Sequence, residues 1–443
     1  MIRTLTVLLL LGWGTSLLAA EPVLRVGAAA AEFPADDEMV IGGSIHAGKV
    51  KGQEGKLRAV AVVIEKPGSG KVAIVACDVL MLTRDLLDPV VEEITTATGI
   101  PASHVLINCT HTHHAPSTVT VHGYQRDELF CRRVQQGIVK SVKDANAVLT
   151  PAGFHFRLGE ESSVGLNSRQ LLADGSIYWI GPRDDFVRPT GPFDPELPVL
   201  AFRTPTGKPI ATVFNHSTHT IGARKPGRSP SFYGLAAQEL EQEHGGIVSF
   251  LEGASGSTHN LFVPTGEAIT RMKTAVTAAA SKATPHAVDV LTSVKKPFAF
   301  RVRTFDEAKE DAAVSAYCKK RAGERADGFI DVFRAQRKTL APKQGEKRTT
   351  WIQAVRIGDV VIVGMPAEFF TGLGQEIKRR SPFRYTYVAE LANDWVGYIP
   401  DRKAFELGGY QTWTGLHSYA APGTGEAMVD SAVDLLNELA KAK

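Results

Sequence analysis

The chain has few cysteines, little net charge and only one long apolar run, and each shortage excludes a class of protein. Four cysteines in 443 residues are too few for a disulfide framework, although an exported protein can form one bridge from them. The formal net charge is only +3, and no basic stripe is interleaved with aromatic residues, so no nucleic-acid partner is expected. Internal repeats and low-complexity linkers are also missing from the sequence.

The one long apolar run lies at the N-terminus, where residues 1–20 read MIRTLTVLLLLGWGTSLLAA. A basic Arg3, a short apolar stretch and small residues at its end are typical of a secretory signal peptide. No later segment reaches the roughly 18 apolar residues that a membrane-spanning helix requires. We therefore expect a signal peptide over residues 1–20, a single mature domain over residues 21–443, and a secreted or periplasmic protein.

Strand-like and helical segments alternate along the rest of the chain. Strands are expected at residues 59–65, 72–76, 105–109, 199–203, 210–215, 247–251, 299–302, 351–357 and 360–363. Apolar residues at three- and four-residue spacing predict helices at 86–98, 128–147, 234–244, 265–282, 306–321 and 426–441. With 44% hydrophobic and 22% charged residues, the chain is globular. The pattern predicts a mixed α/β fold in which helices back the strands.

The most informative segment is VLINCTHTHHAPS at residues 105–117, where an apolar run leads into three histidines. Side chains alternate along a strand, so His111 and His113 can face one pocket while His114 points elsewhere. Neutral imidazole nitrogens bind zinc, and catalytic zinc sites combine about three protein ligands with one open position. The alternative is that one or two of these histidines only complete local hydrogen bonds. The clustering of three favours a metal site.

The segment resembles the histidine block of the neutral ceramidase family, and four further blocks follow in that family's order. They are VFNHSTHT at 213–220, SFLEGASGSTHN at 249–260, VGMPAEFFTGLG at 363–374 and WVGYIPDRKAFELGGYQ at 395–411. The resemblance implies a neutral-ceramidase-like domain whose zinc ligands are His111, His216, Glu368 and Tyr398, with His113 beside the metal. It also implies a short member of the family, without the immunoglobulin-like domain that follows in full ceramidases.

These residue types suit hydrolysis. Zinc held by two imidazoles and a carboxylate lowers the pKa of bound water to about 7 and polarises a carbonyl group. The phenol of Tyr398 can act as a ligand, as an acid or as a donor to an oxyanion. Tyr410, in the GGYQ segment, is a competing tyrosine that spacing alone does not separate from it.

The chain departs from the family at the block that carries the nucleophilic serine. His259 stands at the serine position, with Ser255 and Ser257 as the nearby hydroxyls. A shift of one or two residues on a tight loop moves an oxygen by several ångströms, whereas catalysis tolerates about one. Two alternatives stay open: His259 acts in place of the serine, or the block is shifted so that a serine regains the position. Zinc-activated water needs no serine, so hydrolysis remains the hypothesis.

Three more residues are candidates around the site. Asn167 and Arg169 resemble the family's Asn-Arg segment, with Ser168 between them, and Arg169 is expected to clamp a carboxylate or polarise a carbonyl oxygen. A solvated loop arginine is the alternative. Asp78, at the end of an apolar run, is a candidate acceptor for the outer N–H of a ligating imidazole.

The sequence therefore predicts a secreted zinc-dependent hydrolase that resembles neutral ceramidase and cleaves the amide bond of ceramide or of another small-molecule or lipid N-acyl substrate. A sphingolipid substrate would bring peripheral contact with a membrane, and the oligomeric state is left open. The alternative is a zinc-binding relative that is catalytically degenerate or not specific for ceramide. Ala115 and Pro116 exclude the HxHxDH motif of metallo-β-lactamases, and GASGS lacks the closing glycine of a serine-hydrolase elbow.

Overall fold

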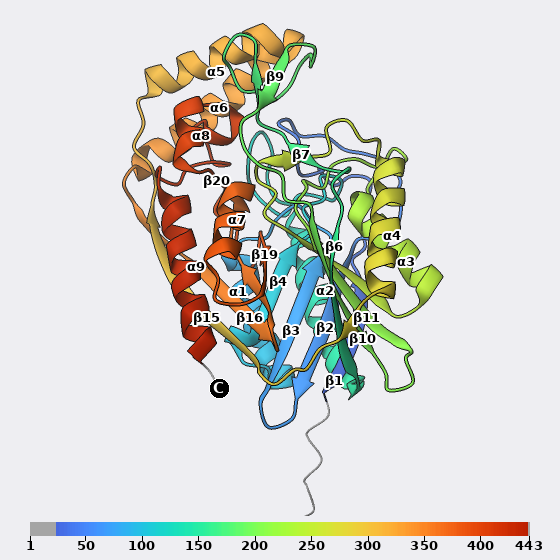
Figure 1. Cartoon of the computed structure of the whole chain (residues 1–443). Helices are drawn as coiled ribbons and strands as arrows, with labels where there is room; N and C mark the ends of the chain where they lie inside the picture. Colours follow the sequence, from blue (N-terminus) through green and yellow to red (C-terminus); the bar gives the residue numbers. More distant parts are fainter. Residues whose placement is uncertain (1–23, 442–443) are drawn as a thin grey trace, which may run out of the picture.

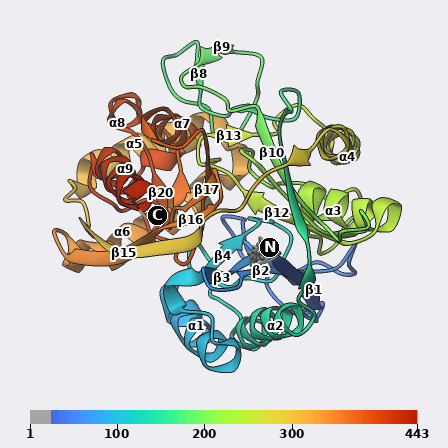
Figure 2. The ribbon, with the colours of Figure 1, turned by 60° about the horizontal axis from the view of Figure 1, so that its bottom comes forward.

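The computed structural model describes residues 24–441, and the expected signal peptide lies outside them. Within this range, three mixed sheets meet in the middle of the molecule and helices cover their outer faces (Figures 1 and 2). None of the described helices is both long enough and apolar enough to cross a membrane. The mixed α/β fold predicted from the sequence is confirmed.

The first sheet is covered by two helices, α1 (Arg84–Thr98) and α2 (Glu128–Ala147), which lie along its outer face in Figure 2. Its strands, in spatial order, are β4 (Val105–Cys109), β3 (Gly70–Cys77), β2 (Arg58–Lys66), β1 (Arg25–Glu32) and β5 (Thr150–Pro151). Strands β3 and β4 run parallel, and the other pairs are antiparallel.

The second sheet is covered by α3 (Ser231–His244) and α4 (Thr265–Ser281), and the third by α7 (Thr371–Arg380) and α9 (Thr424–Lys441). The second sheet contains β12 (Ile247–Glu252), β11 (Pro209–His216), β10 (Glu196–Arg203), β6 (Gly153–Glu160) and β14 (Thr284–Pro285). The third contains β15 (Leu291–Arg301), β16 (Lys347–Ile357), β17 (Val360–Gly364) and β19 (Tyr385–Ala389). Each of these sheets also has one parallel pair, β11 with β12 and β17 with β19.

All three sheets are built by the same connections, although the sequence shows no repeat. In each unit three antiparallel strands are followed by a helix, a fourth strand parallel to the third, and a second helix. The turn between the second and third strands carries a glycine with positive φ in every unit, Gly68, Gly207 and Gly358. These turns lie at one end of the molecule. The long connections between the first and second strands, and the carboxyl ends of the parallel pairs, therefore gather at the other end.

The strands are apolar because both of their faces are buried. On β2, Val63 packs towards α1 and α2, while Val62 and Ile64 pack into a core shared by the inner faces of the three sheets. Phe202 of the second sheet and Ile362 of the third belong to the same inner core. This core fixes the three units against one another, and so fixes the loops that converge at the upper end in Figure 1.

Shorter elements sit on this frame at the upper end. Helices α5 (Glu307–Arg321) and α6 (Ala326–Leu340) form a hairpin between β15 and β16, and α8 (Arg402–Leu407) lies below them (Figure 1). The short strands pair as β7 (Leu166–Asn167) with β13 (Thr258–His259), β8 (Gln170–Leu172) with β9 (Phe186–Pro189), and β18 (Glu368–Phe369) with β20 (Tyr398–Ile399). All four cysteines are buried free thiols, so no bridge forms.

Candidate metal centre

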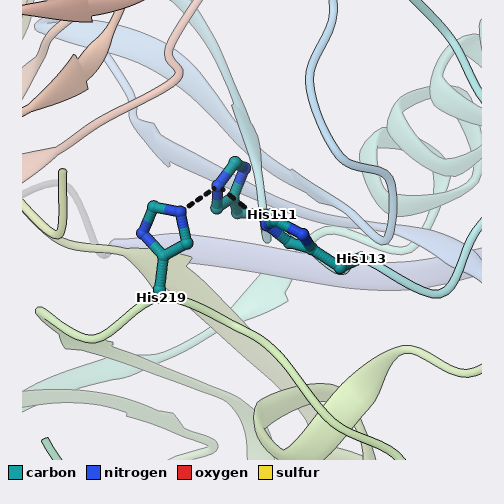
Figure 3. A group of neighbouring side chains, drawn as sticks. All are labelled: His111, His113 and His219. Atoms are coloured by element: carbon teal, nitrogen blue, oxygen red, sulfur yellow. Dashed lines mark hydrogen bonds between the residues drawn. The ribbon is translucent and has the colours of Figure 1, made fainter. Parts of the chain in front are cut away.

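Three imidazoles meet at the carboxyl ends of the parallel strands (Figure 3). The Nε2 atoms of His111 and His219 are 2.9 Å apart, and those of His111 and His113 are 3.3 Å apart. His111 and His219 are buried and His113 is half-buried, and desolvation holds the pKa values of all three below the ordinary value for histidine, to about 4 for His219. The three rings are therefore neutral near pH 7, the form in which histidine binds a metal.

The far nitrogen of each ring fixes its tautomer. Nδ1 of His111 lies 2.9 Å from the Leu80 carbonyl oxygen, and Nδ1 of His113 and His219 lie 3.1 Å from the carbonyl oxygens of Gly43 and Ser255. A carbonyl oxygen only accepts, so each Nδ1 carries the proton and each Nε2 carries a lone pair. The three lone pairs point at one another. The Tyr398 hydroxyl lies 3.2 Å from Nε2 of His219 and can donate a hydrogen bond to it. The Nε2 lone pairs of His111 and His113 are left without a donor.

A carboxylate completes the group. Oε2 of Glu368 lies 3.6 Å from Nε2 of His111 and 3.7 Å from Nε2 of His219, while its Oε1 accepts a 3.0 Å hydrogen bond from Trp395 Nε1. Burial raises the pKa of Glu368 to about 7, and hydrogen bonds from Tyr398 and Trp395 oppose this shift. Strand pairing explains the arrangement, since Glu368 and Tyr398 are register partners in the β18–β20 pair.

The loop after β4, rather than strand alternation, brings His111 and His113 together. Strand β4 ends at Cys109, and the two histidines lie beyond it. His111 has φ +60°, a left-handed conformation that costs a non-glycine residue free energy and tends to occur at functional sites. His114 points away, and its Nε2 accepts a hydrogen bond from the Gly222 N–H at 3.1 Å.

His216 is not part of the cluster, and His219 stands where the family resemblance places His216. His216 ends β11 and turns into the protein, where its ring nitrogens contact the Tyr233 hydroxyl and, at 2.9 Å, the Glu161 carbonyl oxygen. Both nitrogens are thus engaged by protein partners. The two histidines lie in one short block, but a signal separates them: the Thr-His-Thr pattern around His111 recurs only around His219.

The serine block turns its hydroxyls away from the histidines. Ser255 Oγ donates to Glu390 Oε1 at 2.7 Å, and Ser257 Oγ lies 3.2 Å from Thr371 Oγ1. His259 instead stacks on His219, with ring centroids 5.5 Å apart and planes inclined by 20°. Its Nδ1 has no hydrogen-bond partner among the described residues, and burial lowers its pKa to about 3. The placement favours the first alternative, in which a neutral imidazole occupies the serine position.

The remaining candidates have structural contacts. Arg169 is buried and donates to the Ala404 and Gly408 carbonyl oxygens at the carboxyl end of α8, and to Gln411. It is therefore not a solvated arginine, and its guanidinium is held by acceptors of the protein itself. The Asn167 side chain bonds within its own loop region, to the Pro192 carbonyl oxygen and the Arg169 N–H. Asp78 accepts from Thr110 and from the Arg58 N–H rather than from an imidazole.

The donor set fits a metal ion. Two nitrogens bound to one tetrahedral zinc ion at 2.0–2.1 Å lie about 3.3 Å apart, close to the 2.9 Å between Nε2 of His111 and Nε2 of His219. Neutral imidazoles with a neighbouring carboxylate are also the ligand types that zinc prefers. A cation between these donors would satisfy lone pairs that otherwise repel one another. The buried cluster can therefore hold a metal.

A cavity of about 290 Å³ opens above the cluster. His113, His219 and Tyr398 form its floor together with His259, whereas His111 and Glu368 lie deeper. Of the two competing tyrosines, Tyr398 faces the histidines. Tyr410 lines the wall, and its hydroxyl lies 3.1 Å from His122 Nε2.

Comparison with known proteins identifies the fold. No family model and no curated protein matches the chain. The neutral ceramidase from Pseudomonas aeruginosa superposes with a TM-score of 0.74, covering 94% of this chain and 74% of its own at 20% sequence identity. A ceramidase complexed with C2 superposes with a TM-score of 0.73 over 95% of this chain and 75% of its own, at 18% identity. The chain has the fold of the neutral ceramidases, as the order of its sequence blocks predicts.

Proposed function

We propose that this protein is a zinc-dependent hydrolase that cleaves the amide bond of an N-acyl substrate. The observation that carries the proposal is the convergence of three neutral imidazoles whose Nε2 lone pairs face one another beside a buried carboxylate. The fold shared with two ceramidases supports the same class of reaction. We also propose that the protein is exported, because residues 1–20 have the composition of a signal peptide.

His111, His219 and Glu368, which converge at the base of the cavity, would hold the ion. Zinc in such a site supplies Lewis acidity, which activates water and polarises a carbonyl group. The residues above it have separate tasks. Tyr398 is placed to donate a hydrogen bond to the oxygen of the reacting carbonyl, where negative charge develops.

Proton transfer falls to the imidazoles that face the cavity. His113 is neutral and presents Nε2 towards the cluster, because its Nδ1–H is held by the Gly43 carbonyl oxygen. It can take a proton from the attacking water and return it to the leaving nitrogen. His259, at the serine position, lines the same cavity with a neutral ring and is a second candidate for proton transfer. Neither step needs a serine.

Turnover with and without chelator tests the proposal. Purified zinc-loaded protein should hydrolyse at least one of three N-acyl classes, namely short-chain ceramide, N-acyl ethanolamine and N-acyl amino acid. Chelation should abolish the activity and zinc should restore it. His111→Ala should lose both zinc and activity, whereas His114→Ala, a matched change in the same loop, should keep both. Activity that survives chelation, or no activity on any class, would contradict the proposal.

Export is tested by fractionating the source cells and sequencing the N-terminus of the mature protein. A first residue near position 21 in the exported fraction is expected. A full-length chain confined to the cytoplasm would contradict export.

A further inference from the structure

The cavity above the metal centre is walled by the equivalent connection of each of the three units. These connections join the first strand of a unit to its second, and they span residues 33–57, 161–195 and 302–346. Ile45 comes from the first, Trp179 from the second, and Phe329 from the third. The floor of the cavity comes from the frame that the three units share, and the wall comes from these connections. The connections therefore decide which ligand the cavity accepts.

The helical hairpin α5–α6 supports one side of this wall. From α5, the Tyr317 hydroxyl accepts hydrogen bonds from the backbone N–H groups of Trp179 and Ile180, at 2.7 and 3.2 Å. From α6, the Phe329 ring packs 5.5 Å from the Trp179 ring. Trp179 in turn stacks on Tyr410 with ring centroids 4.7 Å apart and planes inclined by only 5°. The hairpin thus holds a rigid aromatic wall beside the metal centre.

The rim of the cavity is positively charged. No aspartate or glutamate is among the described residues that line it, but Arg325 is. Arg325 is exposed, and its guanidinium lies over the Phe329 ring at 5.3 Å, with no carboxylate within ion-pair distance among the described residues. Arg183, beside the same cavity, bonds the Tyr178 hydroxyl and the Leu261 carbonyl oxygen rather than an acid. An anionic group at this rim would meet the guanidinium of Arg325, which no carboxylate pairs, in a cavity whose described lining contains no acidic side chain.

We propose that the substrate is a compact N-acyl amino acid, whose carboxylate binds Arg325 while its amide lies over the metal centre. This inference rests on the proposed amide hydrolysis and narrows its substrate. An arginine guanidinium matches a carboxylate with two parallel hydrogen bonds, which a neutral alcohol head group cannot accept in the same way. The aromatic wall contributes apolar surface for an acyl group or a side chain.

The size of the cavity agrees with a compact ligand. Its volume of about 290 Å³ lies just below the roughly 300–1,000 Å³ that holds a drug-sized ligand. An amide with one short acyl group and one amino-acid side chain fits within such a volume. The two long hydrocarbon chains of a ceramide would extend beyond it.

Binding calorimetry on zinc-loaded protein tests the inference without requiring turnover. The probes are N-acetylphenylalanine and its primary amide, in which a neutral carboxamide replaces the charged carboxylate. Wild type should bind the acid at least about tenfold more tightly than the amide, the effect of one charge-assisted hydrogen bond. Arg325→Gln should remove this preference. Lys319→Gln, an equal loss of charge on the exposed face of α5, should retain it.

The outcomes separate this inference from the proposed function. Equal affinity for acid and amide in wild type, failure of the acid to bind, or a preference that survives in Arg325→Gln would overturn the inference. The last result would mean that the carboxylate binds the metal directly. If the acid binds through Arg325 but no N-acyl compound is hydrolysed, the hydrolase proposal fails and the anion site stands. If ceramide is hydrolysed and the acid is not preferred over the amide, the hydrolase proposal stands and the inferred anion site fails.

Discussion

His219 and His216 give the sharpest test of the metal centre, because the structure and the sequence resemblance assign them opposite roles. Nε2 of His219 lies 2.9 Å from Nε2 of His111, whereas both nitrogens of His216 contact protein groups elsewhere. We expect His219→Ala to lose zinc and His216→Ala to keep it. Both histidines are buried, so each substitution creates a similar cavity and the two variants serve as mutual controls.

The size of the effect follows from linkage between zinc binding and unfolding. At a free zinc concentration of 100 times the wild-type Kd, binding adds about 2.7 kcal/mol to the free energy of unfolding. With an unfolding entropy of about 2.1 cal/mol/K per residue, this raises the Tm of a 443-residue chain by about 3 °C. Loss of one ligand should lower zinc affinity at least about 100-fold, so the rise in His219→Ala falls below about 0.5 °C.

His216→Ala behaves differently in the same assay. Removing a buried imidazole with two hydrogen bonds costs about 3 kcal/mol, so the Tm without zinc falls by about 3 °C. The rise on adding zinc should nevertheless stay near about 3 °C. Calorimetric unfolding with and without buffered zinc measures both values, and elemental analysis counts the bound metal. A zinc-induced rise that persists in His219→Ala but vanishes in His216→Ala would refute the assignment.

Three further predictions concern residues around the site. Ser257→Ala should lower turnover less than about tenfold, because the serine faces Thr371. His259→Ala should lower it by about 100-fold or more, because the imidazole lines the cavity. If the serine variant shows the larger loss, a mechanism with a serine nucleophile is restored. Arg169→Met should lower the unfolding free energy by about 3 kcal/mol without changing zinc content, since the guanidinium caps α8; loss of zinc in a folded variant would contradict this. Burial raises the pKa of Asp78 to about 7 from 3.8, so the folded state retains a proton that the unfolded state releases, and stability from this group is lost as pH rises from about 4 to 7. In Asp78→Asn, the unfolding free energy measured with urea should fall less between about pH 4 and pH 7, by up to about 4 kcal/mol. If the variant loses as much stability over this range as the wild type, Asp78 is not the group responsible.

Much of the fold can be predicted from the sequence because its strands and helices carry strong local patterns. Helix α2 and strand β4 have the predicted bounds, 128–147 and 105–109. Strand β1 is missed because its run of four alanines, residues 28–31, carries little β-propensity and is a strand only through its pairing with β2. The structural repeat of the three units is not visible in the sequence, because the units share the order of their strands and helices but not their side chains.

The site is predicted in part. The blocks that contain its residues can be read from the chain, and His111, His113, Glu368 and Tyr398 lie together in the structure. The Thr-His-Thr pattern distinguishes His219 from His216, but the reason His219 faces the cluster lies in where β11 ends and which way the following turn points. The expected face of His111 rests on strand alternation, yet its left-handed backbone is set by the loop. Local rules of this kind fail where tertiary contacts hold a strained conformation.

The position of the α5–α6 hairpin has a consequence for how specificity can change. Arg301 and Lys347 are register partners, so the 45 or so residues between them leave and re-enter the sheet at one point. A hairpin of different length or charge could be exchanged there without altering the register of β15 and β16 or displacing the cluster histidines, which lie in the loops after β4 and β11. The other two units offer equivalent junctions, β1 to β2 and β6 to β10. The sheets and the loops after β4 and β11 thus form a fixed frame, around which the connections of the second and third units can change, whereas the first connection also holds His113 through the Gly43 carbonyl oxygen. Proteins that share this frame need not share a ligand.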